Sequence, residues 1–454
     1  MLICSYKQVD TAESFFLKSN HLFHYNLPST LLLQSFRYKL LLLRPLMLYT
    51  AIMNKTLIGI IREEKTPPDN RVPLTPRQCA LLQEINPLVE IRVQPSTKRC
   101  FTDAEYEQAG ITVSEDLSDC HILLGVKEPL PDKLTPNKRY LFFSHTIKKQ
   151  PSNQHLLQVV VKKNIELIDY ECLRYTNGKR IIGFGGYAGI VGAHNGLMTL
   201  GIKTGLFSLP PAYKCGDFEQ LKKIYHHLIL PPLKIVLTGA GRVAMGAKEV
   251  LDILKIKQVT AQEYLFKRFD HPVYVHLHNH DLYRHKKQHN YERHEFYHHP
   301  EQFYSTFLPF TQQTDLMING IYWNPKAPTF FTKNDMKSPD FKIKVIADIS
   351  CDINGSIPAT LRATTIENPV MGYNPQTQAE DKPFQPNTID IMSIDNLPNE
   401  LPRDASETFG RLLMDYVIPE LLLPESTIID HATITKNGEL NAHYEYLHDY
   451  LYPS

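Results

Sequence analysis

Two side chains that can transfer protons stand at the ends of successive apolar segments. Lys127 ends the segment "HILLGVK", and His145 follows the segment "YLFFS". Because α/β sheets bind ligands at the carboxyl ends of their strands, both side chains would emerge at one edge of a sheet. Burial and nearby cations would lower the pKa of such a lysine, so the pair could act as acid and base near neutral pH. The same spacing also fits a surface lysine and a capping histidine.

Two arginines could bind substrate carboxylates. Arg71 lies in "DNRVPLTP" and Arg180 lies in "NGKRIIGFG". A guanidinium group matches a carboxylate in a bidentate manner, which makes arginine suitable for this task. A lone arginine is usually a solvated surface residue, so the assignment depends on Lys127 and His145 being present as well.

A glycine-rich turn indicates a nucleotide site. The strand-like segment "KIVLT" runs into Gly239, Gly241 and Gly246 and then into a helical pattern, so amides at a helix N-terminus would face a pyrophosphate. The third glycine comes two residues later than in GxGxxG, and the string alone also fits a plain strand, turn and helix. Val259 and Thr260 end the presumed second strand, where an acidic residue would bind the ribose 2′-hydroxyl. Its absence leaves NADP open, and we expect NAD(P) with a slight preference for NADP.

Histidine is concentrated in one segment. Nine of the 20 histidines fall between His271 and His299. Their spacings match no compact metal site, and no cysteine lies among them. We interpret residues 271–300 as a solvated excursion and expect no metal, with metal binding as the alternative.

Composition excludes several classes of function. The 49 Lys and Arg against 48 Asp and Glu leave a net charge of +1, so no global field favours nucleic acid or an anionic membrane. The apolar run 40–53 is interrupted by Arg44 and Pro45 and is shorter than the roughly 18 residues of a bilayer span. Seven scattered cysteines without a CxxC pattern indicate free thiols, and we expect a cytoplasmic protein. A small-molecule function is therefore expected.

Strand and helix patterns alternate after Met53, which predicts an α/β fold. Helices are expected to begin at Thr75–Pro76 and to cover 405–423. Residues 1–52 show no regular period and are expected to be an extension that is not part of the fold, with a degenerate targeting peptide as the alternative. The glycine-rich segment 182–196 is the expected hinge. The expected strands are 57–61, 89–93, 121–126, 140–144, 165–169, 234–238, 315–319, 342–349 and 389–393.

The chain resembles the lysine-ketoglutarate reductase half of the animal bifunctional aminoadipic semialdehyde synthases, and the related fungal saccharopine dehydrogenases. Similar segments follow one order from Leu57 to the C-terminus, among them "RVPLTP", "LGVKEP", "FFSHTIKKQ", "LIDYE", "INGIYW", "ISCDINGSI" and "SIDNLPNELP". The wider superfamily includes alanine dehydrogenase and the transhydrogenase α subunit, which share the lysine and histidine pair. "FFSHTIKKQ" and "INGIYW" are more similar to the lysine branch.

The resemblance implies two Rossmann-like domains with a cleft between them, the first built from N-terminal and C-terminal segments. Residues 53–185 and 400–454 would form the substrate domain, and residues 186–399 would form the dinucleotide-binding domain with the His-rich excursion at 271–300. The acid/base pair of the family falls on Lys127 and His145. Its substrate-binding positions fall on Arg71, Gln150, Arg180 and Phe184. Its cofactor positions fall on Gly239, Gly241, Arg242, Gly246, Ile394, Asp395, Asn396 and Leu397. From the residues alone, Asp395 could reach the cofactor or could cap a helix.

The implied activity is a reversible, NAD(P)H-dependent condensation of L-lysine with 2-oxoglutarate to saccharopine, through an imine and hydride transfer. One alternative is an alanine dehydrogenase-like enzyme that aminates pyruvate with ammonia. The other is a non-catalytic module that binds a nucleotide or a metal. No nucleic-acid or membrane partner is expected, self-association into a homo-oligomer is left open, and further oxidation of saccharopine would need a separate protein.

Overall fold

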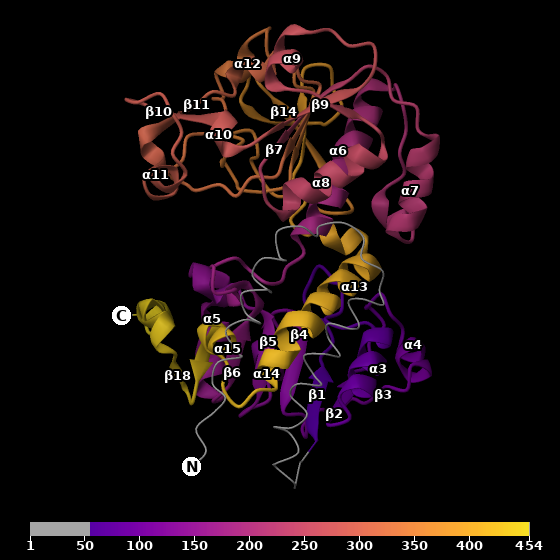
Figure 1. Ribbon diagram of the computed structural model, residues 1–454, viewed down its shortest axis with the longest axis vertical. Coiled ribbons are helices and arrows are strands. Elements are labelled where there is room, and N and C mark those ends of the chain that lie inside the picture. Colours follow the sequence, from indigo (N-terminus) through magenta and orange to yellow (C-terminus); the bar gives the residue numbers. More distant parts are fainter. Residues whose placement is uncertain (1–54, 454) are drawn as a thin grey trace, which may run out of the picture.

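The described residues, 55–453 of a computed structural model, form two α/β bodies stacked along the long axis of the molecule (Figure 1). Each body contains one eight-stranded sheet. The expectations for residues 1–52 and for the apolar run 40–53 lie outside the described residues. No helix between residues 55 and 453 is long and apolar enough to cross a bilayer.

The first sheet has the strand order β18-β17-β6-β5-β4-β1-β2-β3. It is parallel from β3 to β6, whereas β17 runs antiparallel to β6 and β18 antiparallel to β17. One hydrophobic core joins residues 58–182 with residues 409–451, so the two ends of the chain build this body together, as predicted. The strands are β1 (Thr56–Ile60), β2 (Val89–Val93), β3 (Thr112–Val113), β4 (Ile122–Lys127), β5 (Arg139–Phe143), β6 (Glu166–Asp169), β17 (Thr433–Lys436) and β18 (Glu439–Leu440).

The second sheet has the order β15-β14-β16-β13-β12-β7-β9-β8. It is parallel from β8 to β16, with β14 and β15 antiparallel at one edge. The α/β prediction with two Rossmann-like units is thereby confirmed. The strands are β7 (Lys234–Thr238), β8 (Lys257–Gln258), β9 (Val273–Leu277), β12 (Leu316–Asn319), β13 (Val345–Asp348), β14 (Val370–Asn374), β15 (Ala379–Asp381) and β16 (Ile389–Met392).

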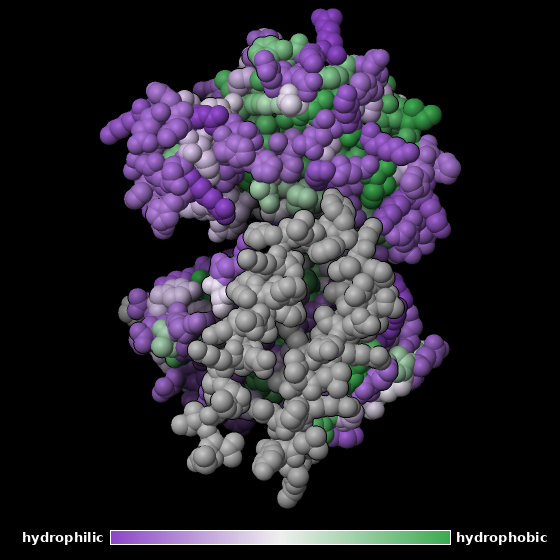
Figure 2. Space-filling model, in the orientation of Figure 1, coloured by the Kyte–Doolittle hydropathy of each residue, from purple (hydrophilic) through white to green (hydrophobic). Residues whose placement is uncertain are grey.

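The interpretation of 271–300 as an excursion is wrong for its first part. β9 lies inside the second sheet, between β7 and β8. Its Val273, Tyr274 and Val275 are buried, because valine and tyrosine favour strands and the neighbouring elements cover this one. The remainder forms α10 (Asn279–Leu282), β10 (Tyr283–His285) and α11 (Arg293–His298), and β10 pairs with β11 (Phe303–Ser305), which follows the segment. The surface over this part is predominantly hydrophilic (Figure 2).

Helices flank both sheets, and the predicted start of the first described helix is confirmed. Thr75 caps it with its hydroxyl, Gln78 returns the contact, and Pro76 takes the first helical position. The helices of the first body are α3 (Pro76–Ile85), α4 (Asp103–Gln108), α5 (Gln154–Lys162), α13 (Pro402–Leu412), α14 (Ile418–Leu421), α15 (Thr427–Ala432) and α16 (His448–Leu451). Those of the second are α6 (Gly185–Thr204), α7 (Phe218–His227), α8 (Arg242–Ile253), α9 (Ala261–Phe266), α10 (Asn279–Leu282), α11 (Arg293–His298) and α12 (Leu308–Thr311).

The helix expected over 405–423 is interrupted. A π-helical turn, Leu413–Val417, separates α13 from α14. Pro419 stands in the first turn of α14, and proline has no N–H with which to continue an α-helical ladder. The break therefore follows from one residue that the predicted helix ignored.

The glycine-rich segment 182–196 is not a hinge over most of its length. From Gly185 onward it belongs to α6, whose residues from Gly189 to Gly201 are buried. Its glycines permit close packing instead, since a Cβ at Gly189 would lie 1.9 Å from the carbonyl oxygen of Val243 in α8. The predicted domain boundaries at 185/186 and 399/400 stay predictions, because strand pairing does not define where one folding unit ends.

Gly246→Ala is expected to destabilise the protein by about 3 kcal/mol through overpacking between α6 and α8. A methyl group there would lie 2.0 Å from the carbonyl oxygen of Gly186. Gly186→Ala is the matched control on the facing helix, because a Cβ at Gly186 meets nothing within 4 Å. Urea unfolding of both variants checks this, and equal midpoints would contradict the packing argument.

Candidate active site

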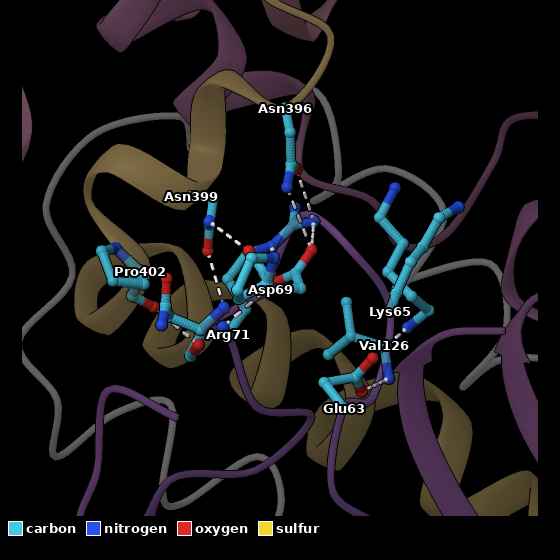
Figure 3. Close-up of polar contacts among 12 residues, drawn as sticks. Glu63, Lys65, Asp69, Arg71, Val126, Asn396, Asn399 and Pro402 are labelled. Atoms are coloured by element: carbon cyan, nitrogen blue, oxygen red, sulfur yellow. Dashed lines mark hydrogen bonds and ion pairs between the residues drawn. The ribbon is translucent and has the colours of Figure 1, made fainter. Parts of the chain in front are cut away.

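The carboxyl ends of the two sheets face each other. Arg71, in the loop after β1, donates from Nη2 to Oδ1 of Asn396, in the loop after β16, over 2.8 Å (Figure 3). Asn399 donates to the carbonyl oxygen of Pro68 over 3.1 Å. The surface is indented between the two bodies on the left of Figure 2. Loops from both sheets therefore meet at one place, where α/β proteins bind ligands.

Lys127 is the last residue of β4 and is half-buried. Burial, followed by the charge of Arg71, lowers its pKa. The carboxyl of Glu63, in the loop after β1, accepts the amides of Val126 at 2.6 Å and of Lys127 at 3.0 Å, which fixes the strand end (Figure 3). Burial raises the pKa of Glu63 to about 8, against the effect of these two amides. The pKa of Lys127 is thus shifted in the direction that favours acid/base chemistry near neutral pH.

His145 lies beyond the end of β5, in left-handed backbone geometry with φ of 55°. The preceding Ser144 is held by the Asp169 carboxylate, which accepts its amide over 3.0 Å, and by Asn153, which donates to its carbonyl oxygen over 2.8 Å. These contacts maintain a backbone conformation that is costly for a residue other than glycine. Burial, and then the charge of Lys127, lowers the pKa of His145 to about 4. Its ring is therefore uncharged near neutral pH and can accept a proton.

Glu171 collects several cationic groups after β6. Its Oε2 lies 3.9 Å from Nδ1 of His145, and its Oε1 lies 3.2 Å from Nζ of Lys148 and also accepts from Arg180. Oε2 is buried and has no hydrogen-bond partner among the described residues. The structure thus gathers Arg180, Lys148 and His145 around one carboxylate, whose second oxygen is buried without a hydrogen bond.

Arg71 is 3% exposed and already engaged. Its Nε donates to Asp69 Oδ1 over 2.9 Å, and its Nη2 donates to Asp69 Oδ2. Its guanidinium lies 4.1 Å from the centre of the Phe184 ring, and that ring stacks on Phe409 at 4.5 Å. Phe184 therefore positions Arg71, and the positive charge is held at the site by an aromatic face and a carboxylate.

The turn after β7 has the shape of a phosphate cradle. Gly239 has φ of 107°, and a Cβ there would lie 2.6 Å from the carbonyl oxygen of Gly320. A Cβ at Gly241 would meet nothing within 4 Å, and no side chain caps the first amides of α8 in the described chain. Open amides at the N-terminus of a 12-residue helix fit a pyrophosphate, so the turn is suited to a dinucleotide. Arg242 begins α8 and donates to the carbonyl oxygens of Ile181 and Ile182 over 3.3 and 3.4 Å.

Several predicted site residues do not join this network. Gln150 is exposed, and its carbonyl oxygen accepts from Tyr450. Gly246 lies in the contact between α6 and α8. Ile394 and Leu397 are 1% and 2% exposed in the second core, so only their backbone is available to a ligand, whereas Asp395 between them is exposed.

The expectation of NADP depended on β8 being the strand next to β7, and this is wrong. β8, which precedes Val259 and Thr260, is the outermost strand, whereas β9 pairs directly with β7. In a dinucleotide-binding sheet, the residue that meets the ribose follows the strand next to the first one. The relevant side chains therefore follow Leu277, and the missing acid at Val259 and Thr260 carries no argument for NADP.

Four acidic residues of the site were not predicted from the sequence. They all lie in loops after strand ends or directly after Lys127, and that position was the available signal: Glu63, Asp69, Glu128 and Glu171. Glu128 forms an ion pair with Lys65 beside Lys127. The cationic groups could be recognised from the sequence, whereas the carboxylates that hold them could not. No group of three or more His, Cys, Asp or Glu within residues 55–453 is arranged to hold a metal ion.

Comparisons with known proteins agree with this arrangement. Residues 59–191 match the family "Alanine dehydrogenase/PNT, N-terminal domain". The mouse "Alpha-aminoadipic semialdehyde synthase, mitochondrial" is 33% identical over 447 residues, which covers 87% of this chain and 48% of the mouse protein. The fission yeast "Saccharopine dehydrogenase [NAD(+), L-lysine-forming]" is 26% identical over 82% of this chain and 94% of its own length. The chain thus spans about half the length of the first of these relatives.

Solved structures show the same fold. An L-alanine dehydrogenase superposes with a TM-score of 0.60 at 17% identity, over 87% of this chain and 99% of its own. A transhydrogenase from Sinorhizobium meliloti superposes with a TM-score of 0.53 at 13% identity, over 84% of this chain and 98% of its own. The chain is therefore similar to the alpha-aminoadipic semialdehyde synthases and to the L-lysine-forming saccharopine dehydrogenases, and its residues 59–191 match the alanine dehydrogenase/PNT N-terminal domain.

Proposed function

We propose that the protein is an oxidoreductase of lysine metabolism that joins L-lysine and 2-oxoglutarate into saccharopine, reversibly, with NAD(P)H. The names of its relatives support the reaction class, since they include saccharopine dehydrogenases that form L-lysine with NAD(+). The bound nicotinamide would supply the hydride. A cytoplasmic location stays a prediction.

The observation that carries the proposal is the placement of Lys127 and His145 at neighbouring strand ends of the first sheet, both with lowered pKa. In the proposed reaction, the ε-amine of lysine attacks the keto carbon of 2-oxoglutarate, and loss of water gives an imine. Lys127 and His145 move protons to and from the carbinolamine oxygen and the amine nitrogen.

Cationic side chains would hold the substrate carboxylates. The guanidinium group of Arg71 is hydrogen-bonded to Asp69, whereas 33% of the Arg180 side chain is exposed. We therefore assign Arg180 the direct carboxylate contact and Arg71 a positioning role together with Phe184. Glu171 Oε2 is buried and lacks a hydrogen-bond partner in the described chain, so it would accept from the substrate amine only if substrate binding opened a path to it.

The test is an assay of NADH and NADPH oxidation with two substrate pairs. We expect turnover with L-lysine plus 2-oxoglutarate and little with ammonia plus pyruvate. Turnover confined to the second pair would favour an alanine dehydrogenase-like enzyme. Nucleotide binding without turnover on either pair would indicate a non-catalytic module.

A further inference from the structure

We propose that Glu400 is protonated in the folded protein and pairs, as a carboxylic acid, with the side-chain amide of Asn195, which makes it a positioning residue for the proposed reaction. Glu400 belongs to the loop after β16, and the same loop carries Asn396 and Asn399. The positioning role rests on the proposed function, whereas the pairing itself can be measured without turnover.

The loop after β16 contacts the first body at the site. Asn396 Oδ1 accepts from Arg71, and Asn396 Nδ2 donates to Asp69 Oδ2 over 3.2 Å. Asn399 Oδ1 accepts the backbone amide of Asn70 over 2.8 Å (Figure 3). The position of this loop therefore determines the contacts of the loop after β1, which include those of Arg71.

Glu400 attaches the same loop to the second body. It is the last residue of the 3₁₀ helix Leu397–Glu400, and it is 3% exposed. Its Oε1 accepts from Nδ2 of Asn195 over 2.6 Å, and Asn195 lies in the buried part of α6. One loop is thus hydrogen-bonded to the first body through its asparagines and to α6 through Glu400.

Asn195 carries the sign that Glu400 holds a proton. Its Oδ1 is buried and has no hydrogen-bond partner among residues 55–453. A buried amide oxygen without a donor is destabilising. An ionised carboxyl can only accept hydrogen bonds, whereas a protonated carboxyl offers one donor and one acceptor, as a side-chain amide does. Only the protonated form of Glu400 can therefore complement both ends of this amide.

The surroundings of Glu400 favour the uncharged form. Burial raises its pKa to about 7, against hydrogen bonds from Asn195 and from the backbone of Tyr213. The charge of Glu367 raises it further, and no basic side chain of the described residues lowers it. A buried carboxyl without a cationic partner keeps its proton because charging it would cost solvation.

Other titratable groups on the elements packed against Glu400 do not supply a counter-charge. On α6, both ring nitrogens of His194 are hydrogen-bonded, and burial lowers its pKa to about 4. Burial raises the pKa of Cys215, and Lys214 beside it is exposed. On α13, Asp404 accepts the first backbone amide of α7, and Arg403 forms an ion pair with a carboxylate of α4.

The variant Glu400→Gln tests the pairing by stability. Glutamine has the shape of the protonated acid and offers a donor and an acceptor at every pH. Because the pKa of Glu400 is raised from 4.5 to about 7, its stabilising contribution is complete below about pH 4.5 and is lost as the pH rises through about 7. Relative to Glu400→Gln, the unfolding equilibrium constant of the natural chain should therefore rise on the order of 50-fold between pH 5 and 8. Urea unfolding of the full chain measures it.

A direct titration does not depend on any variant. The side-chain carboxyl carbon of Glu400 in the natural chain, followed by NMR, should titrate with a midpoint of about 7. Glu425, which is exposed after α14, provides the control. Its carboxyl should titrate near 4.3, and Glu425→Gln should change neither the unfolding constant nor its pH dependence by more than about twofold.

Turnover supplies the readout that a merely structural residue would not change. The ratio of kcat/KM between Glu400→Gln and the natural chain should be near 1 at pH 6 and should reach about threefold or more by pH 8.5, because ionisation displaces the loop only in the natural chain. The ratio cancels the titrations of Lys127 and His145, which both proteins share. Glu400→Ala lacks both hydrogen-bonding groups and should have a lower kcat/KM at pH 6 as well.

The outcomes separate the pairing, the positioning role and the proposed function. A carboxyl midpoint below about pH 5, or a Glu400→Gln protein that is unfolded or inactive at pH 6, would show that Glu400 is ionised and would overturn the inference. A ratio of kcat/KM that stays near 1 at every pH would overturn the positioning role. Absence of turnover by the natural chain would overturn the proposed function, and the NMR and urea measurements would still decide the pairing.

Discussion

Lys127→Met is expected to lower kcat by about 1,000-fold or more, within the range typical of lost acid/base catalysis. Methionine is close in size to lysine but has no titratable group, so the end of β4 can keep its shape while proton transfer by this side chain is lost. The Glu63 contacts to this strand end involve backbone amides, which the substitution retains. Steady-state kinetics with L-lysine and 2-oxoglutarate measure the loss, and nucleotide affinity should change little.

A second readout distinguishes catalysis from packing. The charge of Lys127 is one cause of the lowered pKa of His145, after burial. Removing that charge should therefore raise the pKa of His145, which NMR titration of its ring can follow. Lys162→Met, at an exposed position at the end of α5, is the control and should leave both turnover and that pKa unchanged. Near-normal turnover in a folded Lys127→Met protein would show that the acid/base assignment is wrong.

The positions of Lys127 and His145 at strand ends could be predicted from the sequence, because a short stretch of neighbouring residues determines each strand end. An apolar run followed by a polar residue identifies a strand end, and parallel strands bring their carboxyl ends to one edge. The contact of Arg71 with Asn396 joins residues 325 positions apart, and no local pattern reports it. The burial of Asp69 could not be predicted either. Its partner Arg71 is only two residues away, but the loop after β16 also contacts Asp69 and contributes to its burial.

Hydrophobic periodicity did not predict β9 and α6 correctly, because the burial of their residues depends on neighbouring elements of the fold. The sequence "VYVHL" alternates poorly in hydrophobicity, yet β9 is covered on both sides by strands and lies inside the sheet. The glycines within residues 185–201 favour flexibility when the segment is considered alone. In the fold they lie in α6, where the absence of side chains lets this helix pack closely against α8. In both cases tertiary packing overrides the local preference.

Asp69→Ala is expected to lower the free energy of unfolding by about 3 to 5 kcal/mol, because it leaves the Arg71 charge buried without its carboxylate. Both side chains of this pair are at most 3% exposed. Asp119→Ala is the matched control, since Asp119 pairs with Arg92 at 2.6 Å but is 52% exposed, and it should cost less than about 1 kcal/mol. Replacing both partners, with Asp69→Leu and Arg71→Met, should recover much of the loss if the unpaired charge is its cause.

The pH dependence of this loss tests the same assignment. Burial would raise the pKa of Asp69, but the charge and hydrogen bonds of Arg71 lower it from 3.8 to about 2. A carboxyl with a depressed pKa in the folded state stabilises the protein above its unfolded value, and this contribution is lost as the pH falls toward the folded value. The difference in stability between the natural chain and Asp69→Ala should therefore be constant from pH 7 to about 4 and shrink between about 4 and 2. A difference that persists at pH 2 would mean that lost packing, rather than the ion pair with Arg71, makes Asp69 necessary.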